Sequence, residues 1–176
     1  MPQKKVVIVI AHTGYQPVEY AEPKRILAEA GYHITTASNK PGTARAKDGS
    51  SAVVDVTIDD LNIQDYAALL LIGGPGALDN LDTEQVYELV RLAFADEKII
   101  GAICVVPRIL AHAGILTQLR ATGWDEDNQL TALFKEHDVH YVKEPVVVDE
   151  GIVTAQGPQA ATDFGVEILA LLKALR

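Results

Sequence analysis

The sequence predicts an α/β protein with a mostly parallel central sheet that is covered by helices on both faces. Continuous apolar runs rich in β-branched residues, at 5–11, 67–72 and 98–103, alternate with segments of helical periodicity. Strands separated by helices pair in parallel, because each helix returns the chain to the same edge of the sheet. No linker, low-complexity run or long internal repeat interrupts this rhythm, so we expect one domain over residues 1–176.

The first third of the chain contains two expected strands around one helix. Residues 5–11 form the first strand, which ends in turn residues, and residues 32–38 alternate as a second strand. Between them, residues 18–30 have apolar side chains at helical spacing, and Gly31 is a typical C-terminal stop. Pro23 fits this helix only within its first turn or at a kink.

The middle of the chain begins with an irregular stretch and continues with regular elements. Residues 39–60 are richer in Gly, Ser and Asp, with a short strand expected at 52–56. Residues 67–72 are the clearest buried strand. An amphipathic helix is expected at 83–95, with Asp82 as its N-cap.

The last part of the chain repeats the pattern of strand and helix. We expect a strand at 98–103, a short helix at 107–113 closed by Gly114, a helix near 127–136, strands near 146–148 and 152–155, and a terminal helix from about Ala160. Together these elements predict a flavodoxin-like three-layer sandwich. Ligands of such sheets bind at the carboxyl ends of the strands, beside a topological switch point. The turns after Ala11, Ile72 and Ile103 are therefore the places to look for a site.

Composition excludes several classes of function. The formal net charge of −9 and pI of about 4.9 leave no electrostatic footprint for nucleic acid or for an anionic membrane. The apolar stretch at 6–11 is too short for a signal peptide or a membrane span. A single cysteine permits neither an intrachain disulfide nor a multi-cysteine metal site. We therefore expect a cytoplasmic protein without a metal or other cofactor.

Cys104 is the first candidate for chemistry, because it follows an expected strand and precedes an expected helix. At such a turn, N–H groups and the positive end of the helix dipole lower the pKa of a thiol and make it a nucleophile. The alternative is that this lone cysteine is an inert small hydrophobic residue of the core. Position alone leaves both interpretations open.

A glycine-rich turn and an acidic pair are the next candidates. Gly73-Gly74-Pro75-Gly76 could present backbone N–H groups to an anion, or could simply be a tight turn that needs positive φ. It lacks the Lys-Ser or Lys-Thr pair of a phosphate-binding loop. Glu19 and Glu22 lie one turn apart near a helix start, where both could be solvated. A glutamate buried against the cysteine would instead donate a hydrogen bond that favours thiolate.

The five histidines and the aspartates provide no metal or phospho-acceptor motif. His137 and His140 have helical ligand spacing, but they lie where a helix end enters a strand, which favours a surface pair. His12 follows a carboxyl strand end and is the histidine that we expect near a pocket. Asp55, Asp59 and Asp60 do not follow the first strand, so a receiver domain is disfavoured.

Several segments in the same order resemble the ThiJ/PfpI superfamily, which includes intracellular proteases, a parkinsonism-associated deglycase, glyoxalases and isocyanide hydratases. Residues 102–107, Ala-Ile-Cys-Val-Val-Pro, resemble its nucleophile elbow, and residues 18–23, Val-Glu-Tyr-Ala-Glu-Pro, resemble its first helix with a pocket glutamate. Residues 71–74 are similar to its glycine turn, and residues 146–158 with the terminal helix extend the resemblance over almost the whole chain.

The resemblance implies a role for each matching residue. Cys104 would be the nucleophile and Glu19 its hydrogen-bonding partner, while the N–H groups of Gly74 and Val105 would form the oxyanion or anion hole beside Gly73. It also implies a homodimer or higher homo-oligomer. Protease-type members have a histidine directly after the cysteine, where this chain has Val105.

Glyoxalase-like members often have a histidine near the position of residues 122–125, which here read Thr-Gly-Trp-Asp. A Cys-His-acid triad therefore cannot be transferred, and peptide hydrolysis would lack a proton donor for the leaving amine. Trp124 either walls the pocket or belongs to the core.

Three hypotheses follow for Cys104. It attacks a small electrophile such as a reactive carbonyl compound, with Glu19 relaying the proton. Alternatively, it is oxidised in a stress sensor or protective protein. In the third hypothesis the elbow is vestigial and the protein is a binding module, for which Val105 is the best argument.

Overall fold

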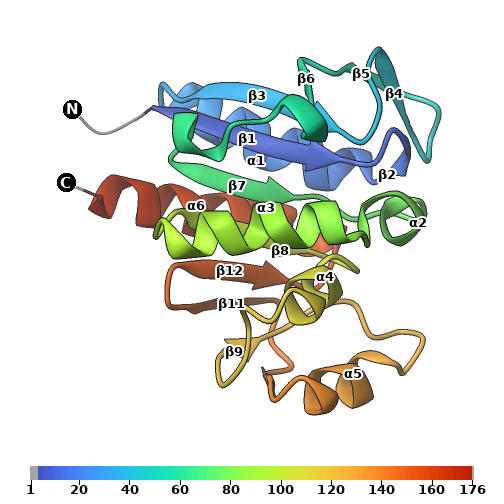
Figure 1. The fold of residues 1–176 in the computed structure, drawn as a ribbon, viewed down its shortest axis with the longest axis vertical. Coiled ribbons are helices and arrows are strands. Elements are labelled where there is room, and N and C mark those ends of the chain that lie inside the picture. Colours follow the sequence, from blue (N-terminus) through green and yellow to red (C-terminus); the bar gives the residue numbers. More distant parts are fainter. Residues whose placement is uncertain (1–3, 176) are drawn as a thin grey trace.

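The computed structural model describes residues 4–175 and confirms the predicted α/β class. Its main sheet has seven strands, in the spatial order β11 (Val146–Asp149), β12 (Ile152–Ala155), β8 (Ile99–Ile103), β7 (Ala68–Leu71), β1 (Lys5–Ile10), β3 (His33–Ser38) and β6 (Val56–Thr57). Neighbouring strands pair in parallel except β11 and β12, which are antiparallel. The carboxyl ends of β1, β7 and β8 therefore meet at one edge of the sheet (Figure 1).

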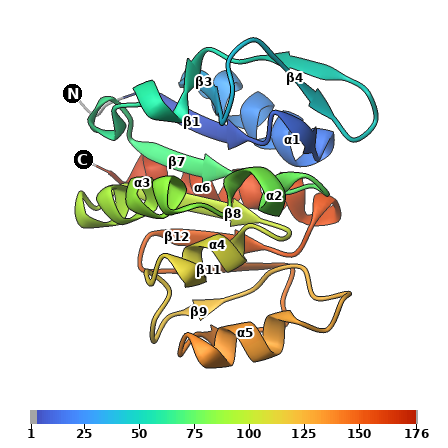
Figure 2. The same ribbon diagram turned by 45° about the vertical axis from the view of Figure 1, so that its right-hand side comes forward.

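Helices cover both faces of this sheet, as predicted. The helices α1 (Pro17–Glu29) and α6 (Ala161–Ala174) pack on one face, and α3 (Glu84–Ala95) and α4 (Pro107–His112) pack on the other (Figure 2). Alternation along β1 explains the two cores, because successive side chains of a strand point to opposite faces. Val6 and Ile8 join the core under α1 and α6, whereas Val7 and Val9 join the core under α3 and α4.

Two glycines allow α6 to approach its neighbours closely. A Cβ atom at Gly101 of β8 would lie 2.8 Å from ring and methyl atoms of Phe164 and Ile168 in α6. A Cβ atom at Gly165 would lie 3.0 Å from the Cα atom of Pro23 in α1. Pro23 thus lies inside α1, beyond its first turn, and is buried against α6. Pro23 is therefore not in the first turn, which was one of the two positions that we expected, and it packs closely against Gly165 of α6.

The segment at 39–60 has more strand structure than the sequence predicts. The strands β4 (Thr43–Ala46) and β5 (Ser51–Val53) form an antiparallel hairpin, and β2 (Thr13–Tyr15) pairs with β4 in parallel. The expected strand at 52–56 is thus divided between β5 and β6. The sequence did not reveal β4 because its exposed and buried residues alternate over only four positions, without an apolar run.

Local boundaries differ from the prediction at two helix starts. The N-cap of α3 is Thr83, whose hydroxyl accepts a hydrogen bond from the Val86 N–H at 3.4 Å, and not Asp82. Asp82 instead contacts the Tyr87 hydroxyl and the His112 ring. The helix α5 (Leu130–Glu136) begins three residues later than expected.

Three further short elements were not predicted: α2 (Ala77–Leu81), β9 (Arg120–Ala121) and β10 (His140–Tyr141), of which the last two pair in parallel. Each is at most five residues long, which gives too few positions for a periodic signal. Within residues 4–175, every helix is too short or too polar to cross a membrane.

Candidate active site

Cys104 occupies a strained turn between β8 and α4. Its φ is +69°, a left-handed conformation that costs free energy for any residue other than glycine. The turn is held on both sides, since the Cys104 N–H donates to the Ala155 carbonyl at 2.9 Å and its own carbonyl accepts from the Trp124 N–H at 2.7 Å. These contacts hold the half-buried thiol at the carboxyl edge of the sheet.

Glu19 reaches the same edge from the first turn of α1. Gln16 caps this helix, because its side-chain oxygen accepts hydrogen bonds from the Val18 and Glu19 N–H groups at 2.6 and 3.0 Å. The Glu19 side chain is completely buried, and its Oε2 accepts from the Gly73 N–H at 2.9 Å. Its Oε1 is also buried, without an N–H or O–H donor among the described residues. Glu22 instead is partly exposed and pairs with a surface arginine.

The turn after β7 places the backbone of two glycines, Gly73 and Gly74, beside the Cys104 side chain. A Cβ atom at Gly73 would lie 2.6 Å from the Cβ atom of Cys104, so only glycine fits there. Gly74 has φ +124°, and a Cβ atom on it would lie 2.4 Å from the Gly14 carbonyl oxygen. The N–H groups of Gly74 and Val105 both interact with the Cys104 side chain. This is the arrangement expected of an anion hole.

The two ionisable groups of the site have strongly shifted pKa values. Burial raises the pKa of Glu19 to about 7, against the smaller effects of the Gly73 N–H and of Cys104. Burial, followed by the charge of the neighbouring Glu19 carboxylate, raises the pKa of Cys104 to about 12. The N–H groups lower the thiol pKa as we expected, but burial and the carboxylate outweigh them. The pair therefore titrates as a unit and holds one negative charge between about pH 7 and pH 12.

A cavity of about 440 Å³ opens over this pair. It is lined by residues of the loops at the carboxyl edge: Gln16, Glu19, Lys47, Gly74, Pro75, Cys104, Val105, Trp124, Glu126, Pro158 and Gln159. Trp124 is half-buried and forms part of the wall of this cavity. Lys47 is near enough to lower the Glu19 pKa slightly.

Sequence reasoning missed about half of this lining. Gln16 has a local signal, because a polar residue before a proline at the first helical position is typical of an N-cap. Lys47, Glu126 and Gln159 have none. They lie on loops that are separated in sequence and meet only in the fold.

The histidines do not enter the cavity. His12 is half-buried, but its Nε2 lies 3.0 Å from the Pro41 carbonyl oxygen, and it is not among the lining residues. The His112 ring contacts Asp82 and stacks edge-on against His137, while His140 is exposed. Within residues 4–175, no three His, Cys, Asp or Glu side chains are arranged to hold a metal ion. The candidate chemistry therefore lies with the pair of Cys104 and Glu19.

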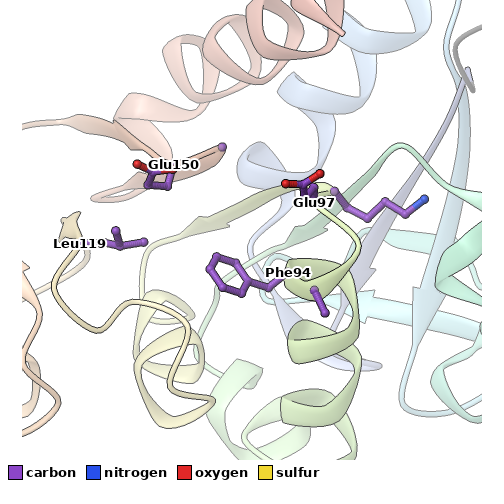
Figure 3. Close-up of a pocket in the computed structure, with 7 residues that line it drawn as sticks. Phe94, Glu97, Leu119 and Glu150 are labelled. Carbon is purple, nitrogen blue, oxygen red and sulfur yellow. The ribbon is translucent and has the colours of Figure 1, made fainter. Parts of the chain in front are cut away.

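A second cavity of about 600 Å³ lies at the opposite end of β8, where Phe94, Glu97, Leu119 and Glu150 surround it (Figure 3). It is larger than the cavity over Cys104. Its lining contains neither a thiol nor a histidine, and it lies at the amino end of the strand. The carboxyl edge is thus the better candidate for catalysis.

Comparison with known proteins identifies the family of this chain. The sequence matches the DJ-1/PfpI family over residues 4–171. General stress protein 18 of Bacillus subtilis is 31% identical over 173 residues, which cover 97% of this chain and 98% of that protein. A deglycase of Pyrococcus horikoshii is 30% identical over 169 residues, which cover 95% of this chain and 99% of that protein. The crystal structure of a ThiJ/PfpI domain protein from Brachyspira murdochii has a TM-score of 0.94 at 27% identity and covers 100% of both chains. This chain therefore belongs to the DJ-1/PfpI family.

Proposed function

We propose that this protein is a cysteine-dependent enzyme that acts on small electrophiles such as reactive carbonyl compounds. Cys104 is the nucleophile and Glu19 is its acid–base partner. One observation carries the proposal: a buried carboxyl with a pKa of about 7 lies against the only thiol of the chain. An acid–base group is most effective when its pKa is near the working pH. The deglycase among the relatives supports the same class of reaction.

The addition step follows from this arrangement. The Cys104 thiol gives its proton to the Glu19 carboxylate, and the sulfur forms a bond to the carbonyl carbon while the π electron pair moves to the oxygen. The Gly74 and Val105 N–H groups, which already face the sulfur, stabilise the negative charge that develops on the oxygen, two bonds away. The Glu19 carboxyl then gives its proton to this oxygen, which leaves a neutral hemithioacetal and a carboxylate.

A 2-oxoaldehyde allows the reaction to continue without a further cofactor. The Glu19 carboxylate takes the proton from the carbon that bears sulfur and returns it to the neighbouring carbon, while the hydroxyl proton passes to the neighbouring oxygen, which yields a 2-hydroxy thioester. Water then cleaves the thioester to a 2-hydroxy acid and regenerates the thiol. Peptide hydrolysis is not included, because no histidine lines the cavity and Val105 follows Cys104.

The test combines turnover of methylglyoxal with the pH dependence of Cys104 alkylation in wild type, Cys104→Ala and Glu19→Gln. We expect Cys104→Ala to abolish turnover and Glu19→Gln to lower kcat by about 10²-fold or more. Wild-type alkylation should rise with a midpoint near pH 7 when the single negative charge of the pair resides on the sulfur, because the pair loses its first proton there. In Glu19→Gln the midpoint should move above the ordinary thiol value of about 8.5, since burial still opposes the thiolate.

Glu22→Gln is the matched control, because Glu22 lies one turn further along α1 but is partly exposed to solvent. It should change neither turnover nor the midpoint. Turnover that persists in Cys104→Ala would contradict the proposal. Stoichiometric oxidation of Cys104 without turnover would indicate a redox sensor, and an ordinary thiol midpoint would indicate a binding module. The homodimer and the cytoplasmic location stay predictions, and light scattering of the purified protein tests the first.

A further inference from the structure

A buried guanidinium lies behind the wall of the candidate cavity. Arg108 is on α4, four residues after Cys104, and is only 5% exposed. Its Nη1 and Nη2 donate to the two carboxylate oxygens of Asp127 at 3.0 and 2.8 Å. The Nη2 also donates to the Trp124 carbonyl at 3.1 Å, and the guanidinium carbon lies 5.6 Å from the centre of the Trp124 ring.

Trp124 has few other means of keeping its place. It belongs to residues 122–129, which form neither helix nor strand. Its N–H donates to the Cys104 carbonyl at 2.7 Å, and its side chain lines the cavity. The nearest regular elements in sequence are β9, which ends at Ala121, and α5, which the Asp125 carboxylate caps through the Leu130 N–H at 2.8 Å. The hydrogen bonds that reach Trp124 itself are those with Cys104 and Arg108, and these two contacts hold the wall against α4.

We propose that Arg108 is a positioning residue that sets the Trp124 wall of the cavity. It does not line the cavity itself, so it acts through Trp124. Arginine suits this role because its planar fork of donors serves the Asp127 carboxylate and a carbonyl at the same time. A lysine has one nitrogen and cannot reproduce both contacts with that geometry. The inference rests on the proposed function of the cavity and adds the residue that fixes its shape.

The chain offers a direct optical probe of this role, because Trp124 is its only tryptophan. Acrylamide quenching of the fluorescence therefore reports the exposure of the wall, whether or not the protein turns over a substrate. We would compare wild type, Arg108→Lys and Arg108→Met. Arg91→Lys is the matched control, since Arg91 makes an exposed pair with Glu84.

We expect quenching to increase in the order wild type, Arg108→Lys, Arg108→Met, with Arg91→Lys equal to wild type. For methylglyoxal, kcat/KM should fall by about 10-fold to 100-fold in Arg108→Met, mostly through KM, with partial rescue by Arg108→Lys. The pH midpoint of Cys104 alkylation should not move, because Glu19 is unchanged. A general loss of folding would instead lower the active fraction at constant KM.

Either of two results would overturn the inference. The first is quenching equal to that of wild type in Arg108→Lys and, if it folds, in Arg108→Met. The second is an unchanged KM together with a shifted midpoint of Cys104 alkylation. Arg108→Lys keeps the charge opposite Asp127, so it decides the matter even if Arg108→Met does not fold. Quenching that depends on Arg108 in a protein without turnover would support the positioning role while contradicting the proposed function.

Discussion

Replacement of Glu19 by glutamine should remove a pH dependence of stability that the buried carboxyl imposes. In the folded protein burial raises the Glu19 pKa from its ordinary value of 4.5 to about 7. Below pH 4.5 the group is protonated in both states. Between these values the folded state keeps a proton that the unfolded state has released, so stability decreases as pH rises.

The magnitude follows from the width of this interval. Each unit of pH between the two pKa values costs about 1.4 kcal/mol, so wild type should lose about 3 kcal/mol relative to Glu19→Gln between pH 4 and pH 8. This difference between the two proteins isolates the pair of Glu19 and Cys104, because the remaining ionisable groups are common to both. The amide itself changes stability by an offset that does not depend on pH.

Urea unfolding followed by far-ultraviolet circular dichroism at intervals from pH 4 to pH 8 measures this difference. Glu22→Gln is again the control. Arg25 holds the pKa of the Glu22 carboxyl below its ordinary range, so wild type should not lose stability relative to Glu22→Gln as pH rises. A difference between wild type and Glu19→Gln that stays constant across the range would refute the assignment of a raised pKa to the buried carboxyl.

Two further predictions concern close packing and backbone strain. Gly101→Ala should lower the free energy of unfolding by about 1–3 kcal/mol, because the new methyl group meets Phe164 and Ile168 at 2.8 Å. Urea unfolding measures this change, and an unchanged unfolding midpoint would contradict the close contact. Cys104→Gly should be about 1 kcal/mol more stable than Cys104→Ala in the same assay, because only glycine adopts φ +69° without strain. Equal stabilities of the two variants would show that the turn stores no strain.

The sequence predicts the sheet well because its central strands are buried on both faces. The runs at 6–10 and 68–71 are apolar throughout, and the structure buries every one of these side chains. The hairpin of β4 and β5 has no such signature, since its strands are short, largely exposed and stabilised by pairing with each other and with β2. Its existence depends on contacts that no local pattern reveals.

The candidate site shows the same division. The elbow at Cys104 and the glycine turn at Gly73 could be located from the sequence, because a strand followed by turn chemistry marks each. The distinct environments of Glu19 and Glu22 could not. Both lie on one side of α1, but Glu19 is buried below the Gly73 N–H, whereas Glu22 bonds to Thr162 at the surface. Only the packing of α1 against the sheet and α6 separates them.

The distribution of hydrogen-bond donors indicates where the single negative charge of the pair resides. Two backbone N–H groups, from Gly74 and Val105, face the Cys104 sulfur, whereas only the Gly73 N–H donates to Glu19. A donor stabilises the charged form of the group that it faces. If the proton lies on Glu19, its O–H also becomes a third donor to the sulfur, and the repulsion between carboxylate and thiolate disappears. This arrangement keeps a nucleophilic sulfur available near neutral pH, although burial raises the pKa of either group alone. It also explains why Glu19→Gln should raise the midpoint of Cys104 alkylation and not lower it.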